Sequence, residues 1–175
     1  MVRKEGNFRM KKVTDADELF YFKRQFFTLD GLWIIETENA TDLDISLKID
    51  LAVWQRLLEI GYRRIRRHLG IHETDMDVVA IIDILSFRWS VEGWVYDIIE
   101  KKADRGRVKI MKCPYKEIMQ RNPERRTIIP RICTEICIPI YDEAVRSMKP
   151  SVQLKRTCFQ GLGDESCDFE FSMHD

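Results

Sequence analysis

A β-hairpin pattern occupies residues 151–171, SVQLKRTCFQGLGDESCDFEF, and it determines what kind of sheet the chain can build. Apolar residues recur at alternate positions on both sides of a turn that contains Gly161 and Gly163. The positions that carry this pattern are Val152, Leu154 and Cys158 on the first strand and Cys167, Phe169 and Phe171 on the second. Because side chains alternate between the two faces of a strand, Cys167 should point inward with the two phenylalanines.

A second hairpin precedes this one. From about Ser86 onward the chain is rich in β-branched and aromatic residues through Ile99, and residues 103–106 (ADRG) provide a connection to a returning strand with Val108 and Ile110. Between the two hairpins we expect a helical turn over residues 115–120 and a helix from about Pro130, kinked at Pro139. The order hairpin, helix, hairpin predicts a four-stranded antiparallel sheet.

The first half of the chain has helical periodicity. Thr14 or Asp15 offers an N-cap for a first helix, residues 50–69 form a long amphipathic pattern, and a third helix is capped near Thr74 or Asp75. Residues 1–12 are basic and weakly patterned, which indicates a frayed arm. The predicted fold is therefore α+β, with N-terminal helices followed by a four-stranded antiparallel sheet packed on helices. We expect one domain over residues 1–175, helical over 13–85 and cysteine-bearing α+β over 86–175.

The composition limits the classes of partner and the cellular compartment that the sequence predicts. The 29 basic and 29 acidic residues give a formal net charge of zero, which disfavours nucleic acid and anionic lipid as partners. No apolar run approaches the roughly 18 residues that a membrane span requires. Five cysteines without a secretory leader pattern predict a cytoplasmic protein, in which clustered thiols bind metal or do redox chemistry more often than they form disulfides.

The cysteines are the first candidates for a functional site. Cys113 ends the returning strand of the first hairpin, Cys133 and Cys137 are four apart on a helix, and Cys158 and Cys167 flank the turn of the last hairpin. A thiolate site built from the hairpin pair, Cys113 and one helix cysteine would suit zinc or an iron-sulfur cluster. The alternative is that each cysteine is a small buried apolar residue, which is the stronger reading for Cys133.

Two other features are open to a functional interpretation. An apolar ligand pocket could be lined by aromatic residues from the N-terminal half and the first hairpin, although such residues are more often core. The residues proposed for this pocket are Phe27, Trp33, Trp54 and Trp94. Residues 62–68 (YRRIRRH) form a dense basic run, which is more typical of a solvated helix end than of a nucleic-acid interface. The usual phosphate, dinucleotide and HExxH motifs are missing, and a Cys-His catalytic pair stays open.

Two stretches carry a family resemblance. They are FFTLDGLW at residues 26–33, followed by DLAVW at 50–54, and CPY at 113–115, followed by Cys137 and GDESCDF at 163–169. Together they resemble the prokaryotic L-2-amino-thiazoline-4-carboxylate hydrolase-like family, and the last hairpin is similar to the 4-vinyl reductase type of small-molecule-binding domain. The resemblance implies the α+β ligand-binding fold shared with nitric-oxide-sensing and Golgi-tethering proteins.

The same resemblance indicates which of the cysteines form the metal site. It implies that Cys113, Cys137, Cys158 and Cys167 form the metal site and that Cys133 is the spare. The function predicted from the sequence is a small-molecule-binding protein with a thiolate metal site, holding zinc or alternatively an iron-sulfur cluster. A hydrolase of a small cyclic amidine or thiazoline, and a redox or gas sensor or regulator, are the alternatives. The expected partner is a small organic ligand, with no membrane and no nucleic acid, and a homodimer is left open.

Overall fold

The computed structural model describes residues 12–174, so nearly all of the segment predicted to be a frayed arm lies outside the described residues. Three long helices precede the first two strands, and further helices separate these from the last two strands, which is the predicted order. They are α1 (Asp15–Ala40), α2 (Leu43–His68), α3 (Val78–Glu92), α4 (Pro114–Arg121) and α6 (Ile138–Met148). Short helical turns connect them: η1 (Glu73–Asp75), η2 (Pro123–Ile128), α5 (Ile129–Arg131), the π-helical η3 (Ile132–Cys137) and η4 (Gln160–Leu162).

Four strands form one antiparallel sheet in the order β1-β2-β4-β3, which confirms the predicted α+β fold class. They are β1 (Val95–Lys101), β2 (Arg105–Lys112), β3 (Val152–Lys155) and β4 (Cys167–Met173). The two central strands pair Val108 with Phe169 and Ile110 with Cys167, and all four side chains are buried. The alternating residues on β2 are exposed, so only one face of the sheet is covered.

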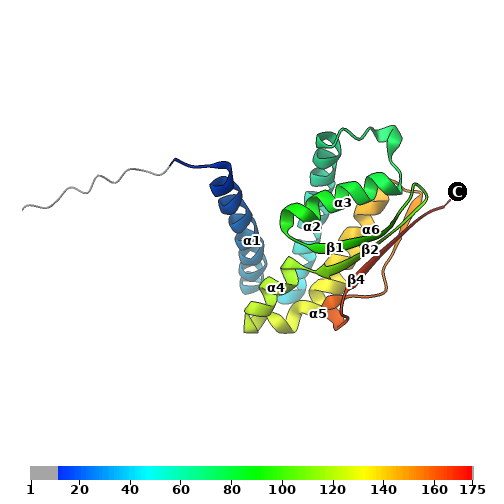
Figure 1. Ribbon diagram of the computed structural model, residues 1–175. Helices are drawn as coiled ribbons and strands as arrows, with labels where there is room; N and C mark the ends of the chain where they lie inside the picture. The colour runs from blue at the N-terminus through cyan, green and yellow to red at the C-terminus, as the bar shows by residue number, and fades with distance from the viewer. Residues whose placement is uncertain (1–11, 175) are drawn as a thin grey trace, which may run out of the picture.

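Helices α3 and α6 pack on the buried face of the sheet, and α2 packs on both of them. The buried apolar residues of these elements form one connected core around Trp89 and Phe169. Helix α1 packs mainly on α2, and Figure 1 shows it on the side of the molecule opposite to the sheet. The fold therefore places α1 outside the main core.

Two helix boundaries differ from the predictions. Helix α2 begins at Leu43 rather than near residue 50, because the Asp42 side chain accepts a hydrogen bond from the Ile45 N–H and caps it there. Helix α3 runs to Glu92, so Val91 is helical rather than extended. It ends at Gly93, whose φ of 89° is a left-handed conformation that favours glycine.

The predicted kink at Pro139 takes the form of a π-helical turn. Proline has no N–H, and its ring crowds the carbonyl four residues earlier, so a regular α-helix cannot continue through it. Just before it, the Ile138 N–H bonds to the Cys133 carbonyl five residues back. Such widened turns occur frequently at functional sites, and this one carries both helix cysteines.

Cys158 lies in a loop, where the sequence predicts a strand. Strand β3 ends at Lys155, and the Asp168 carboxylate then accepts hydrogen bonds from the backbone N–H groups of Thr157 and Cys158. The Thr157 hydroxyl donates to the same carboxylate at 2.5 Å. Because Asp168 takes these donors, the chain leaves the β-ladder before it reaches Cys158.

Candidate functional site

A cavity of about 200 Å³ lies where α1, α2 and α4 meet the π-helical turn and α6. Most of the side chains that line it are apolar, as in small-molecule sites generally. Among the polar groups in the wall are Asp30 from α1, Asp50 from α2 and Arg88 from α3. The cavity therefore combines an apolar wall with a small number of charged groups.

Asp30 and Asp50 form the most unusual feature of this cavity. Asp50 has only 6% of its surface exposed, on the face of α2 that also buries Leu47, Trp54 and Leu58. Burial, together with the smaller effect of the negative charge of Asp30, raises the pKa of Asp50 to about 7. Two carboxyl groups in one poorly solvated site cannot both ionise easily, so the pair retains a proton at a pH where ordinary aspartates have lost it.

Asp30 is the more acidic member of the pair. Burial raises its pKa to about 6, against a hydrogen bond with the Trp54 side chain that lowers it. The charge of Glu92 raises this pKa slightly, and that of Arg88 lowers it. The different surroundings of the two aspartates therefore separate their pKa values, which is the usual arrangement of an acid–base pair.

Arg88 holds a fixed positive charge beside the carboxyl pair. Its Nε donates to Glu92 Oε1 at 2.7 Å, and one terminal nitrogen donates to the Tyr62 hydroxyl at 3.0 Å. The guanidinium lies 5.2 Å from the centre of the Trp54 ring, and its other terminal nitrogen is 3.5 Å from the Tyr115 hydroxyl. Because Glu92 neutralises it and the hydroxyls fix its geometry, Arg88 is held rigidly in the wall of the cavity.

The cysteines divide into those near the cavity and one apart from it. Cys113, Cys133 and Cys137 line the cavity, and Cys167 lies close enough to these thiols for their charges to interact. Cys158 instead lies in the loop after β3, next to the Thr157 hydroxyl at 3.8 Å. The structure thus brings together three of the four predicted ligands and adds Cys133, which the resemblance implies to be the spare.

The thiols near the cavity are held by protein donors. Burial raises the pKa of the Cys113 thiol to about 12 and that of Cys133 to about 11. Arg156 donates to the Cys137 sulfur at 3.4 Å, and the Gln160 N–H donates to the Cys167 sulfur at 3.2 Å. These thiols are therefore packed and hydrogen-bonded within the protein.

The arrangement of the cysteine side chains differs from that of a metal site. Within residues 12–174, no group of three or more histidine, cysteine, aspartate or glutamate side chains is arranged so that it could hold a metal ion. Zinc requires thiolate sulfurs about 2.3 Å from a common centre. As arranged, the cysteines do not fit that geometry.

Phe27, Trp54 and Trp94, three of the four residues predicted to bind a ligand, line the cavity. Trp33 lies outside it, with 49% of its surface exposed on α1. The sequence reasoning missed Asp30, Asp50 and Arg88. The signal for Asp50 was present, because it occupies the apolar stripe of an amphipathic helix where a charged residue needs a reason.

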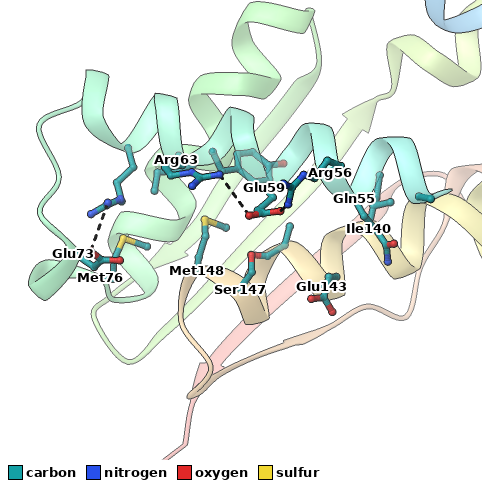
Figure 2. Close-up of a pocket in the computed structure, with 15 residues that line it drawn as sticks. Gln55, Arg56, Glu59, Arg63, Glu73, Met76, Ile140, Glu143, Ser147 and Met148 are labelled. Atoms are coloured by element: carbon teal, nitrogen blue, oxygen red, sulfur yellow. Dashed lines mark hydrogen bonds and ion pairs between the residues drawn. The ribbon is translucent and has the colours of Figure 1, made fainter. Parts of the chain in front are cut away.

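A larger groove of about 700 Å³ lies between α2 and α6, and Figure 2 shows it. Its most prominent charges pair with one another: Glu59 contacts Arg56 at 2.7 Å and Arg63 at 3.5 Å. Such exposed ion pairs contribute little to stability. The pair with Arg63 also neutralises one charge of the basic run at residues 62–68. The smaller cavity is the better candidate site, because it contains a buried pair of carboxyl groups, whereas Glu59 in the larger groove is exposed and paired with arginines.

A protein-family model described as L-2-amino-thiazoline-4-carboxylic acid hydrolase matches residues 37–171. The match covers more than half of the chain and confirms the resemblance inferred from the sequence. The chain belongs to this hydrolase family. The matched segment contains Asp50, Arg88 and all five cysteines, whereas Phe27 and Asp30 on α1 precede it.

No curated protein and no solved structure matches the chain. Within residues 12–174, the helices all lack the combination of length and apolar character that crossing a membrane requires. The family match gives the broad class, a small-molecule-related hydrolase-like domain.

Proposed function

We propose that this chain is a hydrolase that opens a small cyclic amidine of the thiazoline type in the cavity between α1, α2 and α4. The observation that carries the proposal is the Asp30–Asp50 pair, two carboxyl groups with separated and raised pKa values in an apolar cavity. The family match supports the reaction class. A cavity of about 200 Å³ suits a small ring better than a polymer.

The pair can perform both proton transfers of such a hydrolysis. In a protonated 2-amino-thiazoline, the carbon between sulfur and nitrogen is the electrophile. Ionised Asp30 accepts a proton from water as the water oxygen adds to that carbon, and protonated Asp50 donates its proton to the ring sulfur as the C–S bond breaks. The remaining hydroxyl proton leaves to solvent as the carbonyl forms, which gives a urea group and a free thiol.

The other charged groups of the cavity suit the rest of such a substrate. An amidinium cation complements the carboxyl pair, because an opposite charge favours the ionised form of Asp30. Lys116 also lines the cavity and would receive a substrate carboxylate, since the charge of Arg88 is already paired with Glu92. Trp54, which hydrogen-bonds Asp30 and packs against Phe26, would hold the base in place.

The direct test is turnover of L-2-amino-thiazoline-4-carboxylate, followed by nuclear magnetic resonance as the ring opens. We expect wild-type turnover and a loss of about 10²-fold or more in kcat for Asp50→Asn, the usual contribution of a positioned proton donor. The exposed Asp97 on β1 provides the control variant Asp97→Asn, which should retain full activity. Wild-type protein that binds cyclic amidines and opens none of them would contradict the proposal.

The pH dependence supplies an independent check. The proposed state has Asp30 ionised and Asp50 protonated, so kcat/KM should follow a narrow bell. Activity should fall below a pH of about 6 as Asp30 is protonated, and above a pH of about 7 as Asp50 ionises. Activity that rises steadily to high pH would instead indicate a single base with no required acid.

A non-catalytic binding protein with a thiolate metal site is the second candidate, and it requires the four cysteine side chains beside the cavity to move from the arrangement described above to one around a metal. Zinc remains a prediction for this site. Elemental analysis with a visible spectrum, on protein purified without oxygen or chelator, tests it directly. One bound zinc that is lost in Cys137→Ser would support the metal site, and a coloured protein would indicate an iron-sulfur cluster. Metal-free protein would refute it.

A further inference from the structure

Helix α1 carries an exposed apolar seam. Its members recur at steps of three and four residues, which is the heptad spacing of helices that pair side by side. They are Leu19 (60% exposed), Phe22 (66%), Phe26 (36%), Leu29 (66%) and Trp33 (49%). Among residues 15–40 none is buried, and Figure 1 shows the N-terminal half of α1 standing clear of the other helices. Apart from Phe26, whose ring meets that of Trp54 on α2, the seam is therefore apolar surface that residues 12–174 leave largely exposed.

We propose that the seam pairs with the same seam of a second copy, so that two α1 helices pack antiparallel and the chain forms a homodimer. A strict heptad pattern suits another helix rather than a flat surface or an extended peptide. Leu19 would lie against Leu29 of the second copy, and Phe22 against Phe26 of the second copy. Because the arrangement is two-fold symmetric, each of these contacts occurs twice.

Charge favours the antiparallel direction. Lys12 precedes the helix, and Glu36 lies near its other end, both with exposed side chains. In the register above, Lys12 would approach Glu36 of the second copy from just before the helix, while the acidic first turn, which begins at Asp15, would lie near Trp33 of the second copy. A parallel pair would place like charges together at each end, at a cost in stability. The same chain therefore supplies both the apolar seam and the complementary charge.

The area is adequate for a specific dimer. If each seam side chain offers about 200 Å² in full, the exposed fractions give roughly 550 Å² per copy. The total over both copies is then roughly 1,100 Å², above the ~1,000 Å² that a biological interface should exceed. The pairing would also hold α1 in place, and with it the Asp30 wall of the cavity.

Sedimentation velocity of the full chain over a wide concentration range tests the dimer. We expect twice the mass of one chain for wild type and for Phe20→Glu, and the mass of one chain for Phe22→Glu. Phe20 is the matched control, since it lies on the same helix at 65% exposure but off the seam. Far-ultraviolet circular dichroism should show that both variants keep the wild-type helix content.

Wild-type protein that sediments as one chain at every concentration would overturn the proposal, as would equal effects of the two glutamate variants. The register has its own test. Under mild oxidation, Leu19→Cys combined with Leu29→Cys should form a covalent dimer, and Leu19→Cys alone should form none. Efficient linkage by Leu19→Cys alone would show a parallel pair and refute the antiparallel arrangement. These readouts need no substrate, so they can fail while the hydrolase proposal stands.

Discussion

Helices α1 and α3 are both rich in large apolar residues, yet they bury them very differently. Helix α3 buries eight of its 15 residues, including Trp89 and a run of isoleucine and leucine, against α2 and the sheet. Helix α1 has 26 residues and buries none, although it contains several phenylalanines. Apolar content alone therefore does not distinguish a core helix from one whose apolar surface serves a ligand or a partner.

The contrast extends to the groups that each helix faces. Trp89 on α3 donates its indole N–H to the Tyr141 hydroxyl at 2.8 Å and packs edge-on to Phe169 at 5.0 Å. On α1, Asp30 faces a second carboxyl group across a cavity. The contacts under α3 therefore stabilise the fold, whereas the contacts under α1 include carboxyl groups with raised pKa values, which are typical of catalytic sites.

The largest expected effect compares one phenylalanine from each side. Phe169 is fully buried against Trp89, whereas Phe20 on α1 is 65% exposed. We expect Phe169→Ala to lower the free energy of unfolding by about 3–5 kcal/mol, the range for a large buried aromatic. Phe20→Ala should change it by less than about 0.5 kcal/mol. Urea titrations measure both, and similar losses would erase the distinction between the two regions.

The carboxyl pair gives the next effect, which depends on pH. Asp50 has a folded-state pKa of about 7, above its ordinary value of 3.8, so the fold favours its protonated form. Its contribution to stability is full below pH 3.8 and is lost as the pH rises through about 7. Asp50→Asn removes that loss and should stabilise the protein at pH 8 by roughly 2–4 kcal/mol.

The gain from Asp50→Asn should shrink steadily as the pH falls toward 4. Thermal melts of wild type, Asp50→Asn and the exposed control Asp97→Asn at several pH values measure it. A gain of equal size at pH 4 and pH 8 would mean that the amide improves packing and that the charge of Asp50 is not costly. That outcome would remove the main support for the acid–base pair.

Much of the α3 side could be predicted from the sequence. The alternation through Val108, Ile110 and Phe169 determined both the sheet and its buried face, because a shift of one residue would turn every apolar side chain to solvent. The same alternation predicts that Cys167 points inward. Its side chain is buried, with 7% of the residue surface exposed. Periodicity and turn residues are local signals, and this part of the fold depends on them.

The α1 side could not be predicted in the same way. Asp30 and Asp50 are 20 positions apart and meet only because α1 folds back on α2, which no local pattern reports. Cys158 read as a strand residue because its parity matched, but the hydrogen bonds to Asp168 outweigh that preference. Trp33 and Phe27 looked equivalent, although the first faces outward and the second lines the cavity.

Two glycines, one beneath α3 and one on α1, allow the same comparison through smaller changes in the free energy of unfolding. Gly106 on β2 lies beneath α3, where an added Cβ would overlap Ile82 and stand 2.9 Å from Val78. Gly106→Ala should therefore lower the free energy of unfolding by about 1–3 kcal/mol, as overpacking does. Chemical denaturation checks this value, and a neutral result would show that α3 is free to move away from the sheet.

Gly31 on α1 is the opposite case and the smallest effect. An added Cβ there would meet nothing within 4 Å, and the residue lies in the interior of a long helix. Gly31→Ala should raise the free energy of unfolding by about 0.5–1 kcal/mol, because alanine loses less backbone entropy on entering a helix. Gly61→Ala on α2, which also has open space, is the matched control and should gain a similar amount. If only Gly61→Ala is stabilising, α1 is not helical at Gly31 in solution, and the Asp30 wall of the cavity would need another support.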